Sequence, residues 1–208
     1  MTRRITLTTT DGLRLDGRLD GPDATPVTVV WCHPHPLFGG TMFAPLMNAV
    51  TDGLVADGFG VLRFAFRGVG DSEGSHDGGR GEVDDVAAAM GHARTLGARP
   101  VVAGWSFGAA TAARYLATAA ADRHVRYVGV APPTDHLPDA ERIGGERATF
   151  VIGSRDQVVD PAAVREYART ASAELIEVEG ADHFFTLRSA PIVDAIRRAV
   201  EAVSPPPA

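Results

Sequence analysis

The strongest constraint on the fold of this chain is the alternation of short apolar runs with amphipathic helical patterns. Six runs have the continuous apolar character of strands buried on both faces: residues 27–32, 60–65, 100–104, 125–130, 148–153 and 174–178. Helical periodicity fills the intervals, at residues 43–54, 83–96, 107–121, 161–170 and 191–203. Strands and helices in this order form a mostly parallel sheet covered on both faces, so the chain is predicted to adopt an α/β fold.

Two further strands are predicted before this series, in residues 5–9 and 13–19. Both alternate apolar and polar side chains, and Asp11-Gly12 between them is a hairpin signal. They are expected to be antiparallel edge strands, which brings the sheet to about eight strands. No repeat, linker or change of composition divides the chain. Residues 1–203 are therefore expected to form one domain, followed by a frayed proline-rich tail at 204–208.

The composition excludes several classes of protein. The 208 residues carry a formal net charge of −6 without a basic stripe, which argues against nucleic-acid binding. The chain contains no lysine, so Schiff-base enzymes and P-loop proteins are excluded. Its single cysteine, Cys32, allows no intrachain disulfide and no thiolate zinc cluster. No apolar stretch suits a signal peptide or a membrane span, so we expect a cytoplasmic protein without membrane contact.

The segment Gly104-Trp105-Ser106-Phe107-Gly108 follows one of the apolar runs and opens a helix. A GxSxG sequence in this position is typical of a nucleophile elbow, whose tight turn leaves no room for side chains two residues before and after the serine. We therefore predict that Ser106 is a nucleophile and that the amide of Phe107, at a helix N-terminus, stabilises an oxyanion. The alternative is a tight turn with an incidental serine.

A nucleophilic serine needs a general base that is itself oriented by a carboxylate. Asp156 and His183 each follow a buried apolar run, and the order Ser, Asp, His along the chain suits the elbow. The carboxyl ends of parallel strands meet at one edge of a sheet. We therefore expect Ser106, Asp156 and His183 to lie together as a catalytic triad.

Other titratable residues offer alternatives. Asp160 competes with Asp156 as the acid, although its place just before a proline suits a helix cap better. His136 lies in the irregular segment 131–145, where it is either a substrate contact over the pocket or an exposed loop residue. Three more histidines are expected to be solvated, namely His76, His92 and His124.

The segment 33–41 begins His33-Pro34-His35-Pro36 and lies where this architecture draws its second oxyanion donor. Proline has no N–H, and His33 belongs to the strand end, so the amide of His35 is the predicted donor. The HxH spacing also suits a metal, but the sequence offers no convincing third ligand. We expect no metal and no cofactor.

The glycine-rich loop 66–74 also follows a strand that ends at this edge. The simpler interpretation is that Arg67 and Asp71 brace the loop, and the alternative is that Arg67 binds a substrate carboxylate. The loop lacks the GxGxxG pattern of a dinucleotide site.

These motifs resemble the α/β-hydrolase superfamily over about residues 5–203. The HPHPxxGGT, FRGVGxSEG, GxSFG and DHFF segments are similar to those of small bacterial hydrolases related to dienelactone-hydrolase-like enzymes. The resemblance implies that Ser106 is the nucleophile, Asp156 the acid and His183 the base, with the amides of Phe107 and His35 as the oxyanion hole. A serine stands where dienelactone hydrolase has a cysteine, so the substrate of that enzyme is not transferred.

The predicted function is that of a serine hydrolase acting on a small carboxylic ester or thioester. The alternatives are a peptidase or amidase with the same triad, and a catalytically silent hydrolase fold that serves as a binding module. The segment 131–145 stands where many relatives insert a lid, and its prolines and few large apolar residues predict a wall rather than a tunnel. Four residues are candidates for the lining of a shallow pocket for short acyl groups: Phe38, Trp105, Phe184 and His136.

Overall fold

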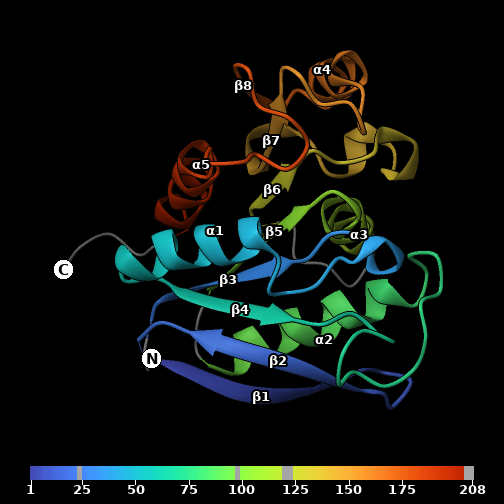
Figure 1. Cartoon of the computed structure of the whole chain (residues 1–208), viewed down its shortest axis with the longest axis vertical. Helices are drawn as coiled ribbons and strands as arrows, with labels where there is room; N and C mark the ends of the chain where they lie inside the picture. The colour runs from blue at the N-terminus through green and yellow to red at the C-terminus, as the bar shows by residue number, and fades with distance from the viewer. Residues whose placement is uncertain (23–24, 97–98, 119–123, 204–208) are drawn as a thin grey trace.

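The computed structural model describes residues 1–22, 25–96, 99–118 and 124–203. Its centre is an eight-stranded sheet with the strand order β1-β2-β4-β3-β5-β6-β7-β8 (Figure 1). Strands β3 to β8 run parallel, whereas β1 pairs with β2 and β2 with β4 in antiparallel fashion. This arrangement confirms the α/β fold class. The strands are β1 (Thr2–Thr8), β2 (Arg14–Asp20), β3 (Val27–Cys32), β4 (Gly60–Phe64), β5 (Arg99–Trp105), β6 (Tyr127–Val130), β7 (Ala148–Gly153) and β8 (Glu174–Val178).

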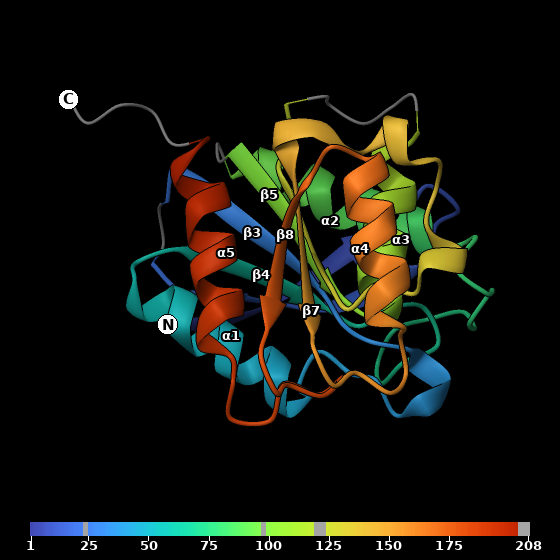
Figure 2. The same ribbon diagram turned by 90° about the horizontal axis from the view of Figure 1, so that it is seen from above.

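Helices cover both faces of the sheet (Figure 2). Helices α1 (Pro45–Ala56) and α5 (Ala190–Glu201) pack together on one face. The other face is covered by α2 (Glu82–Thr95), α3 (Phe107–Leu116) and α4 (Pro161–Thr170). No helix in the described ranges is both long and apolar enough to cross a bilayer.

The hairpin forms as the sequence predicts, but only one of its strands is an edge strand. Thr8 lies opposite Arg14, and β1 is at the edge of the sheet. The interpretation of both strands as edge strands is wrong for β2, because its second half also pairs with β4. Leu15 and Leu19 of β2 are buried, so this strand contributes to the core.

The helix boundaries follow local signals. The Asp160 carboxylate accepts the N–H of Ala162 at 2.9 Å, and Pro161 occupies the first position of α4, so Asp160 is a helix cap. Helix α3 ends at Leu116, before the predicted residue 121. The hydroxyl of Thr118 donates to the carbonyl of Tyr115 at 2.8 Å and so satisfies a terminal carbonyl group there. Residues 119–121 of the predicted helix lie outside the described residues.

Strands β3, β4 and β6 are buried at every position. Their continuous apolar runs therefore reflect helices on both faces. Because β3 to β8 are parallel, the loops that follow them emerge at one edge of the sheet. The expected single domain stays a prediction, and the tail at 204–208 lies outside the described residues.

The segment 131–145 between β6 and β7 contains short 3-10 turns at Thr134–His136 and Ala140–Arg142, and a third, Gly145–Arg147, begins at its end. Ile143 is fully buried in the core. The hydroxyl of Tyr167 on α4 donates to the carbonyl of Pro138 at 2.5 Å. These contacts hold the segment against α4 and against the core, so it forms a wall at this part of the protein surface.

Candidate active site

Ser106 lies at the tight turn between β5 and α3. Its backbone angles, φ 55° and ψ −120°, fall in a region that L-residues rarely adopt. A Cβ atom on Gly104 would lie 2.4 Å from the backbone of Gly108, and one on Gly108 would lie 2.4 Å from the carbonyl oxygens of Cys32 and His33. Both positions therefore require glycine, which is the steric condition that the sequence pattern predicts for an elbow.

Three side chains form a hydrogen-bonded chain at the carboxyl ends of β5, β7 and β8. Nε2 of His183 lies 3.1 Å from Oγ of Ser106. Nδ1 of the same ring lies 2.8 Å from Oδ2 of Asp156. His183 and Asp156 are 6% and 7% exposed, so water reaches this row of hydrogen-bonded side chains mainly at Ser106. The structure thus brings together the three residues that the sequence groups as a triad.

Backbone and indole groups hold the acid and the imidazole in place. Oδ1 of Asp156 accepts the N–H groups of Val158 and Val159, both at 2.8 Å. Oδ2 is then directed to Nδ1 of His183, which is the ring nitrogen that carries the proton. The indole N–H of Trp105 donates to the carbonyl of His183 at 3.1 Å. The neutral ring consequently presents the lone pair of Nε2 to the serine hydroxyl.

Two backbone amides are candidates for an oxyanion hole. The amide of Phe107 is in the first turn of α3, where N–H groups have no intrahelical partner. The amide of His35 makes no hydrogen bond with any described residue, while its carbonyl accepts the amides of Phe38 and Gly40 at 3.1 and 3.0 Å. A Cβ atom on Gly40 would lie 2.2 Å from the carbonyl oxygen of Pro34, so the loop needs glycine there.

His33 and Cys32 are buried structural residues. Nδ1 of His33 donates to the carbonyl of Pro34 at 2.7 Å, and Nε2 accepts the N–H of Phe66 at 3.0 Å. Burial lowers the pKa of His33 to about 4, so the ring is neutral at pH 7. Burial also raises the pKa of the Cys32 thiol far above its usual range. Across the described ranges, no group of three or more His, Cys, Asp or Glu side chains could hold a metal ion.

Two pockets meet at Ser106. The first, about 240 Å³, is here called the α3 pocket, and its lining includes Phe107, Ala110, Thr111, Arg114, His35, His76 and His136. The second, about 480 Å³, is called the aromatic pocket, and its lining includes Phe38, Pro45, Trp105, Val158, His183 and Phe184. His183 lines only the aromatic pocket.

The four pocket residues expected from the sequence all lie on these walls. His136 lines the α3 pocket, Phe38 lines both pockets, and Trp105 and Phe184 line the aromatic pocket. Phe38 and Phe184 are 86% and 58% exposed, so they form a rim rather than an enclosed floor.

His76 is not solvated, and the interpretation of it as a surface histidine is wrong. Its side chain is 14% exposed, and Nδ1 lies 2.6 Å from Oε1 of the fully buried Glu82, at an angle that is not that of a hydrogen bond. Its ring centroid is 5.0 Å from that of His35. The sequence does not reveal this contact because it depends on how the loop folds over α2. His92 is half-buried, and burial lowers its pKa, whereas His124 is exposed as expected.

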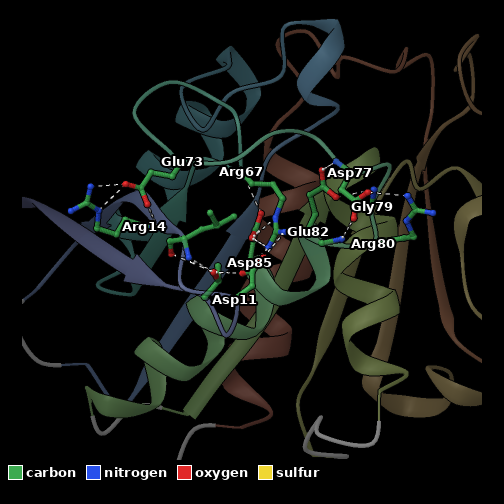
Figure 3. A network of polar contacts seen from close by, with 12 residues as sticks. Asp11, Arg14, Arg67, Glu73, Asp77, Gly79, Arg80, Glu82 and Asp85 are labelled. Atoms are coloured by element: carbon green, nitrogen blue, oxygen red, sulfur yellow. Dashed lines mark hydrogen bonds and ion pairs between the residues drawn. The ribbon is translucent and has the colours of Figure 1, made fainter.

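Arg67 is not open to a substrate. Its guanidinium donates to Asp85 at 2.9 and 2.7 Å and to Asp11 at 3.1 Å (Figure 3). The side chains of Arg67 and Asp85 are 8% and 0% exposed. Asp71 pairs instead with Arg4 at 2.6 Å. Arg67 therefore ties its loop and the N-terminal hairpin to α2. The interpretation of this residue as a brace is confirmed, but its partners are Asp85 and Asp11, and Asp71 holds the loop to β1 instead.

Arg114 is a residue of this site that sequence reasoning missed. It is half-buried on α3 and lines the α3 pocket. The spacing of Phe107, Ala110, Thr111 and Arg114 puts all four on one face of the helix. That periodicity, counted from the residue after Ser106, is the signal that could have found it.

Comparisons with known proteins place this geometry in a family. No family model matches the chain. The chain is 30% identical over 202 residues to an uncharacterized protein of Rickettsia prowazekii, with 87% of this chain and 83% of that protein covered. It also resembles an α/β serine hydrolase without a lid from Xanthomonas campestris, with a TM-score of 0.85 and 29% identity over 100% of this chain and 97% of the other. The chain belongs to the α/β-hydrolase superfamily.

Further α/β hydrolases have the same architecture. An α/β serine hydrolase homologue from Coxiella burnetii is 28% identical, with a TM-score of 0.78 and 97% of each chain covered. The esterase Pf2001 of Pyrococcus furiosus has a TM-score of 0.81 and covers 97% of this chain and 92% of its own, but at 21% identity it supports the fold alone. The α/β-hydrolase fold without a large lid is confirmed, and the dienelactone-hydrolase-like subtype stays a prediction.

Proposed function

We propose that this α/β hydrolase is a serine hydrolase that cleaves a carboxylic ester or thioester through an acyl-enzyme on Ser106. The observation that carries the proposal is the hydrogen-bonded chain from Ser106 through His183 to Asp156, with links of 3.1 and 2.8 Å. Serine at its ordinary pKa is a poor nucleophile, and an imidazole at this distance is placed to take its proton.

The proposed reaction begins with transfer of the hydroxyl proton of Ser106 to Nε2 of His183 as Oγ attacks the carbonyl carbon. Asp156 stabilises the imidazolium that forms, because Oδ2 already accepts the proton on Nδ1. The carbonyl oxygen becomes an oxyanion, and the amides of Phe107 and His35 are its proposed donors. His183 then returns the proton to the departing alcohol or thiol, and the acyl group remains on Ser106.

Deacylation uses the same groups with water as the nucleophile. His183 takes a proton from water, the resulting hydroxide attacks the acyl carbon, and the proton passes to Oγ of Ser106 as the acid departs. No cofactor or metal enters either half of this scheme. The proposed partner is a small ester or thioester, and the absence of nucleic-acid and membrane partners and a cytoplasmic location stay predictions.

The role of Ser106 is tested with a fluorophosphonate probe and with Ser106→Ala. The probe should label Ser106, and the substitution should lower kcat for p-nitrophenyl acetate by about 10⁴- to 10⁶-fold with little change in Tm, because the triad acts as a unit while the elbow keeps its glycines. Mass spectrometry of the labelled protein identifies the site, and modification of a residue other than Ser106 would falsify the assignment.

Parallel assays separate the ester proposal from its alternatives. Aminoacyl amides should be cleaved far more slowly than esters under the same conditions. A reversed preference would indicate an amidase, and a protein that neither reacts with the probe nor cleaves any ester would be a silent binding module.

A further inference from the structure

The α3 pocket extends from Ser106 along one face of α3 toward the guanidinium of Arg114. The two residues are eight positions apart, so their Cα atoms are separated by about 12 Å along the helix axis. Long side chains on a helix lean toward its N-terminus, which shortens this span. The surroundings of Gly79 agree with this, because both side chains lie beside that residue. A Cβ atom added to Gly79 would be 2.7 Å from Nη1 of Arg114 and 3.5 Å from the ring of Phe107. The guanidinium therefore lies close to the residue that follows Ser106.

No described residue neutralises the charge of Arg114. Other arginines, such as Arg67 and Arg165, pair with carboxylates at 2.7 Å. In the described part of the chain, Arg114 has neither an ion pair nor a hydrogen bond. The last turn of α3 favours a cation through the helix dipole, but that does not require the side chain to reach back over the pocket. A half-buried guanidinium offers paired N–H donors that match the two oxygens of a carboxylate.

Three histidines, His35, His76 and His136, line the same pocket. Nδ1 of His35 accepts the amide of Leu37 at 3.2 Å, so in the neutral ring Nε2 carries the proton. Burial, followed by the neighbouring imidazole of His76, lowers the pKa of His35 and so favours the neutral ring.

None of the described residues that line the α3 pocket is an aspartate or a glutamate. Glu82 is fully buried in contact with His76 and accepts the N–H of Gly79 at 2.9 Å, which holds the loop beside α3 (Figure 3). Asp135 has an 80% exposed side chain and lies 3.8 Å from His136. It does not line the α3 pocket but borders a second hollow, which Arg114 and His136 also line. An anion in the α3 pocket would thus meet the guanidinium without a carboxylate in the wall.

The position of His183 decides which part of the substrate enters each pocket. The leaving group receives its proton from Nε2 of His183, and this residue lines the aromatic pocket but not the α3 pocket. An apolar alcohol or thiol therefore occupies the aromatic pocket, and the acyl group lies along α3. This step rests on the proposed function.

We propose that the substrate is the monoester or monothioester of a short dicarboxylic acid, whose free carboxylate binds Arg114 at the end of the α3 pocket. Hydrolysis then follows the scheme above, and the free carboxylate takes no part in the bonds that change. Arg114 acts in binding and specificity. A chain of about four or five carbons spans from the serine to the guanidinium, given the helix rise and the lean of the side chain.

The test compares two esters that differ in one group, monobenzyl glutarate and the benzyl ester of glutaramic acid. The wild-type protein should prefer the carboxylate over the isosteric amide by about 10- to 100-fold in kcat/KM, the range for hydrogen bonds to charged groups. Arg114→Gln should reduce this ratio to near one. Arg169→Gln is the matched control, because Arg169 is 73% exposed and paired with Glu166 on α4, and it should keep the wild-type ratio.

Calorimetry separates this proposal from the proposed function. Glutarate titrated into Ser106→Ala should bind more tightly than glutaramate, and adding Arg114→Gln should abolish the difference, whether or not the wild type cleaves p-nitrophenyl acetate. Arg114→Lys, which keeps the charge but not the paired donors, should retain part of the preference if the glutamine variant does not fold. Equal measurable rates for the two benzyl esters in the wild type, equal binding of glutarate and glutaramate to Ser106→Ala, or an undiminished preference in Arg114→Gln would overturn the assignment.

Discussion

At the scale of single residues, His33 couples the fold to pH. Its neutral ring donates from Nδ1 and accepts at Nε2, and a proton on Nε2 would face the N–H of Phe66. Burial lowers its pKa from 6.5 to about 4, so the unfolded chain binds the proton first as the pH falls. The stabilisation that the neutral His33 ring gives to the folded state is present above about pH 6.5 and is lost as the pH falls toward 4. We expect the titration of His33 to lower the free energy of unfolding by about 2 kcal/mol when the pH falls from 7 to 5.

Urea unfolding of wild type and His33→Gln at these two pH values measures this contribution. Glutamine can accept from Phe66 and donate to Pro34 but does not titrate, so the variant should lose about 2 kcal/mol less than the wild type on acidification. His35 and His92 titrate in both proteins and cancel in the difference. The same pH dependence in both proteins would show that His33 is not the responsible group.

At the scale of elements, the contact between α3 and β3 positions the nucleophile. A methyl group on Gly108 would meet the carbonyl oxygens of Cys32 and His33 at 2.4 Å and push α3 away from the end of β3. Gly108→Ala should therefore lower the unfolding free energy by about 1–3 kcal/mol and also lower kcat.

Gly91→Ala is a matched control on α2, where an added Cβ meets nothing within 4 Å, and it should stabilise the protein by about 0.5–1 kcal/mol. Urea unfolding and p-nitrophenyl acetate hydrolysis measure both effects. Equal stabilisation by the two substitutions would contradict the tight approach of α3 to β3.

At the scale of the whole molecule, the absence of a large lid limits the acyl group. The segment 131–145 is a wall tied to α4, and the α3 pocket has a volume of about 240 Å³. Methylenes beyond the pocket remain in water, and each one forgoes about 0.8 kcal/mol of binding. Among p-nitrophenyl esters from acetate to palmitate, kcat/KM should reach its maximum at about two to six carbons. A steady increase to twelve carbons, measured below the micelle concentrations, would show that further apolar surface covers the site.

Much of this molecule is encoded in patterns that are local along the chain. The alternation of apolar runs and helical periodicity predicts the α/β sheet, because a strand or a helix forms from neighbouring residues and buries the face that they share. Gly104 and Gly108 predict the elbow at Ser106, because its steric requirement concerns residues two positions away. Asp156 and His183 could be grouped with Ser106 because parallel strands bring the loops at their carboxyl ends to one edge.

Other features depend on contacts between residues far apart in the sequence, and only the tertiary structure decided them. The pairing of β2 with β4, the contact of His76 with the buried Glu82 and the use of Arg67 as a brace all join separate segments of the chain. The sequence determined which side chains are present and which edge of the sheet they follow. Burial and the identity of each partner decide which charge remains free for a ligand. Packing alone therefore distinguishes Arg67, which is neutralised by Asp85, from Arg114, which has no ion pair with any described residue.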